Sequence, residues 1–237
     1  MRNLSALFVT AALVLLDATA NAQALPGSLW YNGDFNGLTW LSNEYNTAVS
    51  QSNTYDDFNV PSGPGWHVTG LYSADLLTFG FSASSAEWEI RTGVSNGNAG
   101  TLVAGGILSP ATLMGTGRGG GGFIEYDVLV SGLNITLAPG TYFISVAPSG
   151  FGTGRSLNSA TSGTNCVGTP CGSDGNAFFN STFFGAYFAP STTWCGSECH
   201  DFSDGVIGTV VPEPATVALL ICGAGALLIA LCRRRAV

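Results

Sequence analysis

Four cysteines are the residues of this sequence best suited to covalent chemistry. They form two closely spaced pairs, Cys166 with Cys171 and Cys195 with Cys199. Outside the cytoplasm such cysteines are typically oxidised, and a turn can bring paired Cα atoms within the roughly 4.4–6.8 Å that a disulfide requires. A zinc site made of these thiolates and His200 is the alternative, because zinc prefers sulfur and imidazole ligands. An oxidising compartment favours the two local disulfides.

Residues suited to acid–base or nucleophilic catalysis are few. His67 and His200 are the only histidines, and neither lies in a hydrolase or metalloprotease motif. A His200–Asp201 dyad and a Glu87/Glu89 pair are candidates by residue type alone. Any exposed strand places alternate side chains on one face, so the glutamate pair carries little information. We therefore predict no catalytic residues and no enzyme activity.

Oxygen-bearing side chains at alternate positions suggest a calcium loop. Asn32, Asp34 and Asn36 have the spacing with which such a loop begins, and a glycine follows in the sixth position. The glutamate that the loop needs at its twelfth position is absent, although Asp56 and Asp57 could contribute from elsewhere. The segment is a weak calcium candidate with a polar turn as the alternative, and we predict no other metal and no cofactor.

Tryptophans are the side chains best suited to contact a sugar, because sugar rings stack on exposed indoles. A sandwich core also needs large aromatic side chains, so most of the five tryptophans have a structural explanation. Trp66 and Trp88 lie in segments with a strand pattern, and we expect both to be buried. Trp40 and Trp194 lie in polar segments, and we predict that these two are exposed and available for sugar contact.

Alternating apolar and polar residues predict β-strands throughout the segment that carries these side chains. Trp88 and Ile90 alternate with charged residues, and residues 123–130 alternate in the same way. Residues 133–146 predict a β-hairpin whose turn is 138–141. Further strands are predicted at 66–73, 76–81, 102–108 and 177–184. The pattern predicts one all-β domain over residues 23–211, a single β-sandwich of jelly-roll type.

Charge excludes one class of partner. Charged residues make up only 9% of the 237-residue chain, its net charge is −8, and it contains no lysine. Residues 23–211 hold three arginines against thirteen acidic residues. A protein attracted to phosphate backbones needs a basic face, so we predict no nucleic-acid partner. A surface hydrated by neutral polar groups suits both an extracellular setting and contact with sugars.

The N-terminal segment has the layout of a secretory signal peptide. Arg2 precedes the apolar stretch of residues 4–16, and Ala20 and Ala22 provide small residues at the cleavage positions. Thirteen apolar residues are too few to span a bilayer core of about 30 Å. We predict that residues 1–22 are a signal peptide.

The C-terminal segment combines three features without a spacer. Pro212, Glu213 and Pro214 precede an apolar run over 215–232, and Arg233, Arg234 and Arg235 follow it. Eighteen residues rise about 27 Å as a helix, which suffices for a transmembrane helix. The arginines would stay cytoplasmic, so residues 23–211 would lie outside.

These three features together resemble the PEP-CTERM sorting signal of exported Gram-negative bacterial proteins. The resemblance covers residues 212–235 and implies recognition by an exosortase, a membrane protease-transpeptidase of bacteria that make extracellular polysaccharide. Segments 55–61, 65–69, 88–91 and 137–142 also resemble the sandwich domains of proteins with such tails, which implies a fold but no activity.

The resemblance implies an exported protein of the cell surface or extracellular matrix, with unknown molecular activity. Its localisation would begin as a single-pass inner-membrane intermediate, and the tail would then be cleaved. Its partners would be an exosortase and extracellular polysaccharide. A secreted carbohydrate-binding module acting on exopolysaccharide is the alternative function.

Overall fold

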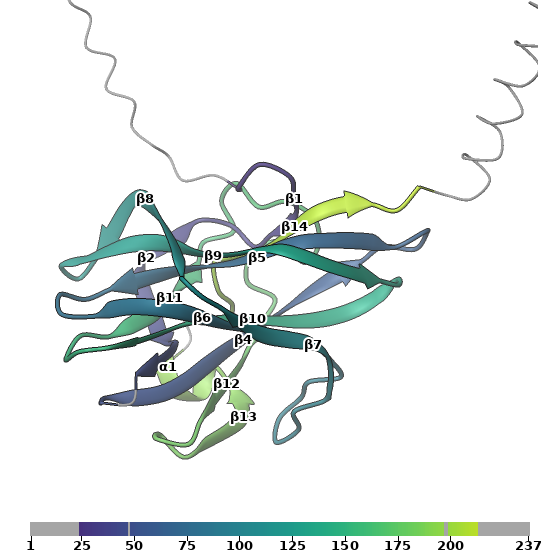
Figure 1. The fold of residues 1–237 in the computed structure, drawn as a ribbon. Coiled ribbons are helices and arrows are strands. Elements are labelled where there is room, and N and C mark those ends of the chain that lie inside the picture. The colour runs from purple at the N-terminus through teal and green to yellow at the C-terminus, as the bar shows by residue number, and fades with distance from the viewer. Residues whose placement is uncertain (1–23, 47, 197–198, 213–237) are drawn as a thin grey trace, which may run out of the picture.

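The computed structural model describes residues 24–46, 48–196 and 199–212, which form two packed β-sheets and one short helix (Figure 1). The first sheet contains β1 (Ser28–Tyr31), β2 (Phe35–Ser42), β5 (Trp66–Leu77), β8 (Thr112–Gly120), β9 (Phe123–Leu137), β11 (Ser156–Thr161) and β14 (Asp204–Val210). The second contains β3 (Glu44–Asn46), β4 (Ser50–Val60), β6 (Ser82–Thr92), β7 (Thr101–Leu108), β10 (Gly140–Phe151), β12 (Phe178–Ser181) and β13 (Ala186–Pro190). The helix is α1 (Thr192–Cys195). The predicted all-β, sandwich-like class is confirmed.

Strand β5 is the centre of the first sheet. Strand β9 pairs with it along its whole length, from Trp66 opposite Leu137 to Leu77 opposite Ile124. On its other edge β14 pairs with the first part of β5, and β11 with the last part. Strands β14 and β11 therefore lie end to end against β5. The chain segment after β11 bridges to the end of β1 through Val167 and Tyr31.

The second sheet runs in the order β13-β12-β4-β3-β10-β6-β7, and β4 also pairs directly with β10. Its registers are antiparallel except between β10 and β3. The short strand β3 lies in the break between β4 and β10 and carries Glu44 into the interior, where the side chain is buried.

The predicted hairpin over residues 133–146 is wrong in its pairing. The two strands exist as the end of β9 and the start of β10, but β9 pairs in the first sheet and β10 in the second. The turn at 138–141 instead carries the chain from one sheet to the other, and Tyr142 donates a hydrogen bond to the Ala138 carbonyl across it. Leu137 and Ile144 enter the same core from opposite sheets, which a hairpin within one sheet would not allow.

Strand lengths differ from the sequence prediction in one further place. Residues 66–77 form one continuous strand, so the separate strand predicted over 76–81 is wrong except for its first two residues. The Phe81 amide instead donates to the Thr78 carbonyl in a turn before β6. The strand at 102–108 is observed as β7, whereas the strand predicted over 177–184 is shorter, because β12 ends at Ser181 and a turn follows.

The apolar core occupies one half of the space between the sheets. Inward alternation in β6 is confirmed, because Ile90 is buried and Trp88 packs against the same cluster. Trp66 is buried and stacks on Phe58 at 5.8 Å between ring centroids. The predicted interior position of Trp66 is confirmed, while Trp88 is only partly buried.

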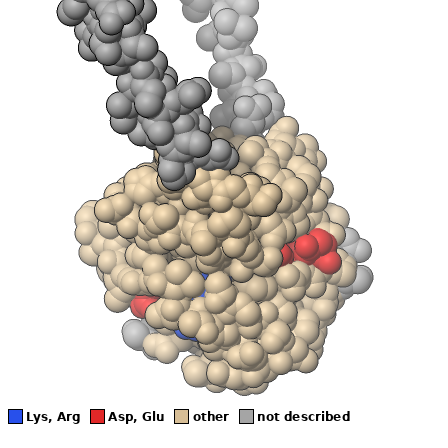
Figure 2. Space-filling model, turned by 90° about the vertical axis from the view of Figure 1, so that its right-hand side faces the viewer, with Lys and Arg blue, Asp and Glu red and all other residues tan. Residues whose placement is uncertain are grey.

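Both ends of the described chain lie on one side of the molecule. Ser28 pairs with Ile207, and the Gly208 amide donates to the Gly27 carbonyl, so β1 and β14 run together. Figure 1 shows these ends above the first sheet, whereas α1, β12 and β13 lie beyond the second sheet. The face seen in Figure 2 displays few charged side chains, as the composition predicts.

Candidate functional site

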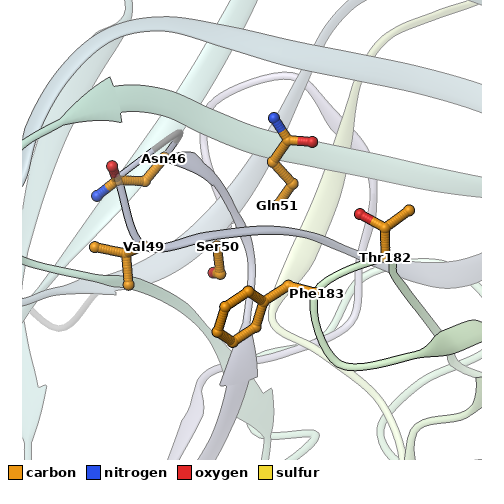
Figure 3. Close-up of a pocket in the computed structure, with 6 residues that line it drawn as sticks. All are labelled: Asn46, Val49, Ser50, Gln51, Thr182 and Phe183. Atoms are coloured by element: carbon orange, nitrogen blue, oxygen red, sulfur yellow. The ribbon is translucent and has the colours of Figure 1, made fainter.

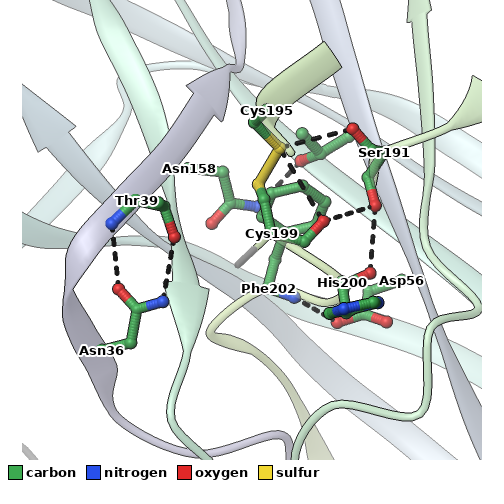
Figure 4. Close-up of a disulfide and its surroundings, with 10 residues drawn as sticks. Asn36, Thr39, Asp56, Asn158, Ser191, Cys195, Cys199, His200 and Phe202 are labelled. Atoms are coloured by element: carbon green, nitrogen blue, oxygen red, sulfur yellow. Dashed lines mark hydrogen bonds between the residues drawn. A yellow bond between two sulfur atoms is a disulfide. The ribbon is translucent and has the colours of Figure 1, made fainter. Parts of the chain in front are cut away.

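A disulfide positions the first tryptophan of the site. Cys195 and Cys199 form one bridge with Cα atoms 5.6 Å apart, and Cys166 and Cys171 form the other with 5.5 Å. Both local pairings are confirmed. The Cys195–Cys199 bridge begins at the last residue of α1 (Figure 4), and Trp194 immediately precedes the bridged Cys195.

Ser191 fastens the same loop from its N-terminal side. Its hydroxyl lies 2.8 Å from the Cys199 carbonyl and 3.0 Å from the His200 carbonyl, to which it donates. Its own carbonyl accepts the amides of Trp194 and Cys195. Cys199 is fully buried against Phe179 and Phe202 in a small apolar cluster, so the loop is anchored in the protein and does not rest on the bridge alone.

Strand β2 supplies the second tryptophan. Trp40 is half-buried in a strand, so its predicted exposure is not confirmed; its ring lies edge-to-face on Phe123 at 5.7 Å and tilted against Phe35 at 6.4 Å. It lies on an edge strand of the first sheet, where it pairs through Ser159 of β11. Packing on one side leaves the remaining surface of the indole available to a ligand.

The two tryptophans line one pocket of about 240 Å³. The structure thus brings together the two residues that the sequence predicts for sugar contact. Trp194 is 39% exposed and Phe184 is 37% exposed, and their ring centroids lie 6.2 Å apart. The pocket is lined by Trp40, Leu41, Ser42, Arg155, Leu157, Phe179, Phe184, Trp194 and Cys195.

Arg155 is the charged side chain of the pocket. Its Nε forms an ion pair with buried Glu44, and its Nη2 donates to the Ser42 hydroxyl at 2.8 Å. Glu44 also accepts from Ser50 and from the Ser156 amide. Because a carboxylate neutralises the guanidinium, the pocket presents hydrogen-bond donors without a net positive charge.

A second hollow of about 260 Å³ adjoins the first. It is lined by Asn46, Val49, Ser50, Gln51, Thr182 and Phe183 (Figure 3). The Ser50 hydroxyl lies 3.3 Å from that of Ser42 in the tryptophan pocket, and the Phe183 and Phe184 rings are 4.9 Å apart. The two hollows therefore share a wall and together form one strip of aromatic rings, amides and hydroxyls, which we call the aromatic strip.

The calcium candidates do not converge on one point. Asn32 is buried and donates to Asp56, whereas Asp34 forms an ion pair with Arg118 at 2.6 Å. Asn36 turns back on its own loop and accepts the amides of Leu38 and Thr39 (Figure 4). The three side chains thus have separate partners and do not form the calcium loop that their spacing suggests.

The other residues considered for catalysis have structural partners. Asp201 accepts the backbone amides of residues 174–176. Glu89 forms an ion pair with Arg91 at 2.6 Å and accepts a hydrogen bond from Tyr55. Burial raises the pKa of Glu87. His67 shares a hydrogen bond with Asn134 on the surface.

Carboxylates buried between the sheets are the feature that sequence reasoning missed. Asp56, Asp75 and Asp204 are fully buried, and burial raises the pKa of Asp75 to about 7. The pKa values of Asp56 and Asp204 are also raised well above the usual range, first by burial, and for Asp56 next by the charges of Asp201 and Asp204. Alternation assigns polar residues to the outer face, so no periodic signal could have revealed them.

Arg155, Glu44 and the phenylalanines of β12–β13 were also missed. Residues 23–211 contain only three arginines and no lysine, so each arginine could have been singled out from the sequence as a partner for a carboxylate. In the described part of the chain, no three or more His, Cys, Asp and Glu side chains are grouped so as to hold a metal ion.

The terminal signals lie mostly outside the described residues. This applies to the signal peptide at 1–22, to Glu213 and Pro214, and to the tail at 215–237. Within the described ranges no helix has the length and apolar character needed to cross a membrane. Comparisons with family models, with curated proteins and with solved structures found no significant match to the chain.

Proposed function

We propose that the chain is an exported protein whose β-sandwich, of jelly-roll type, is displayed outside the cytoplasm and binds neutral polysaccharide along the aromatic strip without turning it over. Export would use the signal peptide at 1–22. Sorting would use Pro212, Glu213 and Pro214 with the apolar segment 215–232 and the arginines at 233–235, and an exosortase would cleave this tail.

The observation that carries the proposal is the meeting of Trp40 and Trp194 in one pocket. Aromatic faces stack on the apolar faces of sugar rings, and hydroxyl and amide groups beside them satisfy sugar hydroxyls. The strip supplies both, because Ser42, Gln51 and Thr182 lie beside the rings. This favours a binding module over a purely structural matrix protein.

Charge supports a neutral ligand. Glu44 neutralises Arg155, and the segment 23–211 carries ten more acidic than basic residues. An acidic polysaccharide would be repelled by this domain, whereas a neutral one would meet no long-range barrier.

The position of the strip supports display from an attached tail. The described chain ends beside β14, on the side of the first sheet, whereas α1, β12 and β13 lie beyond the second (Figure 1). A domain attached through residue 212 would thus present Trp194 away from its point of attachment. The two disulfides are compatible with an extracytoplasmic location.

Binding is tested with the full chain in detergent against cellulose, mannan, xylan and galactan. We expect retention by at least one of these, weakened about 3- to 10-fold by Trp194→Ala or Trp40→Ala, because a stacked aromatic ring contributes about 0.5–1.5 kcal/mol. Phe79→Ala is the matched control, since Phe79 is a fully exposed aromatic ring that lines neither pocket of the strip. Equal loss in all three variants, or no retention, would reject the binding role.

Export and sorting are tested separately by the intact mass of protein from the native envelope. We expect a mass below 24.3 kDa by the loss of residues 1–22 and of the tail. Full-length protein would reject the processing part of the proposal and leave the binding part untouched.

A further inference from the structure

Four fully buried side chains with oxygen atoms come from strands or strand ends of both sheets. Asp56 comes from β4 of the second sheet, and Asn158 and Asp204 come from β11 and β14 of the first. Asn32 follows β1, and its backbone N–H donates to the backbone carbonyl of Asp204 at 3.0 Å. We call these four residues the oxygen cluster; Figure 4 shows Asp56 and Asn158 in the surroundings of the Cys195–Cys199 disulfide.

Hydrogen bonds within the cluster use up its donors. Asn32 Nδ2 donates to Asp56 Oδ2 at 2.9 Å, and the Phe202 amide donates to the same oxygen at 2.7 Å. Asn158 Nδ2 donates to Asp204 Oδ1 at 3.0 Å and to Thr54 at 2.8 Å. Each carboxamide nitrogen therefore faces a carboxylate.

The atoms that remain without partners are all oxygens. Asn32 Oδ1, Asn158 Oδ1 and Asp204 Oδ2 are buried and have no hydrogen-bond partner among the described residues. A buried acceptor without a donor is unfavourable, and the arrangement repeats at three neighbouring side chains. Both oxygens of Asp56 accept hydrogen bonds, so it is these three oxygens that lack positive charge or hydrogen-bond donors.

No arginine supplies that charge. Arg91 is bound to Glu89, Arg155 to Glu44, and Arg118 to Asp34 and Glu125. Two carboxylates in a dry interior require compensation, because an isolated buried charge is strongly destabilising. Asp57, Asp75 and Asp201 lie nearby and add further negative charge.

We infer that the oxygen cluster is a calcium site in which Asp56, Asp204, Asn32 and Asn158 supply the ligands. Calcium takes carboxylate and carboxamide oxygens in an adaptable geometry. Two carboxylates balance its charge, and the three unpartnered oxygens become ligands. Magnesium fits less well because it retains water, and zinc prefers nitrogen and sulfur.

A bound calcium ion would join the two sheets and brace the aromatic strip. Asp56 belongs to the second sheet and Asp204 to the first, so one ion would bridge both. The segment between Cys199 and Asp204 leads directly from the disulfide to the cluster, and its Phe202 amide is bonded to Asp56. Calcium would therefore stabilise the loop that carries Trp194.

The test uses the full chain in detergent, purified without chelator. Atomic emission should find one calcium per chain, and the thermal unfolding midpoint should rise by about 5 °C or more from EGTA to about 1 mM CaCl₂. The same concentration of MgCl₂ should give a much smaller rise. Terbium should bind to the wild-type protein with luminescence sensitised by neighbouring aromatic residues, and calcium should displace it.

Asp204→Asn should abolish the calcium-dependent rise, whereas Asp127→Asn, a matched variant at another buried carboxylate, should retain it. Equal midpoints in EGTA and CaCl₂ with no bound calcium would overturn the inference, as would equal effects of calcium and magnesium. If Asp204→Asn raised the midpoint in both solutions, a shared proton would replace the cation as the compensating charge. Should that variant fail to fold, the terbium experiment on wild-type protein decides the question.

Discussion

Asp127 illustrates how burial changes the chemistry of a single residue. Its pKa is raised to about 7, first by burial and next by the charge of Glu125, while the charge of Arg118 lowers it. Asp34 also faces it, and Asp127 in turn raises the pKa of Tyr72. The folded state therefore retains a proton on Asp127 at pH values where the unfolded chain, with a pKa near 3.9, has lost it.

The sign of the pH dependence follows from this difference. Between about pH 4 and 7 the folded state binds more protons than the unfolded state, so the contribution of Asp127 to stability falls as the pH rises through this window. The loss is at most about 1.4 kcal/mol per pH unit and ends above the folded pKa. We expect the stability advantage of Asp127→Asn over the wild type to grow from pH 5 to about pH 7 and to stay constant above that pH.

Urea unfolding followed by tryptophan fluorescence at pH 5, 6, 7 and 8 measures this difference. Parallel pH profiles for the wild type and Asp127→Asn would show that Asp127 is ionised throughout.

The Cys195–Cys199 disulfide is the covalent link next to Trp194. A disulfide that closes four or five residues removes little entropy from the unfolded chain, about 2 kcal/mol in the chain-entropy description. The apolar core does not include either bridge, and Cys199 lies in the smaller cluster beside the loop. The bridge therefore orders the strip more than it holds the sheets together.

We expect the Cys195→Ser/Cys199→Ser variant to fold, to be cut faster by thermolysin near residues 190–201, and to bind polysaccharide more weakly. Burial of a serine at position 199 adds a modest cost to stability. The matched control is Cys166→Ser/Cys171→Ser, whose bridge lies beside Trp30 through its Pro170 contact and away from the strip. That variant should retain binding, and loss of the whole fold in the first variant would contradict the local role of its bridge.

At the scale of the whole molecule, low charge determines how the domain meets its ligand. With a paired arginine in the pocket and a net acidic domain, binding would rest on stacking and neutral hydrogen bonds. Such contacts are short-ranged and are not screened by salt. We expect the affinity for a neutral polysaccharide to change less than about 2-fold between 0.05 and 0.5 M NaCl.

The same titration with alginate, a polyanion, provides the comparison and should show no binding at low salt. A steep loss of affinity with salt, or retention on alginate, would point to ionic contacts through Arg155 and would contradict a neutral ligand.

Local pattern in the sequence determined the strands and several of their inward faces. Ile90 and Trp66 are buried as alternation predicts, and the close spacing of the cysteines was sufficient to identify both disulfides. These features depend on residues that are close together in the chain, and such local relations can be identified from the sequence alone. The exposure of Trp194 follows in the same way from its polar surroundings.

Only the tertiary structure decided which strands pair and which distant side chains meet. The segments at 133–137 and 140–146 have the pattern of a hairpin, but they belong to different sheets because pairing depends on partners such as Trp66 and Arg91, far away in the chain. Trp40 and Trp194 share a pocket for the same reason. The burial of Asp56 and Asp204 is likewise a property of the space between two sheets, where hydrogen bonds from distant residues replace the water that an aspartate otherwise requires.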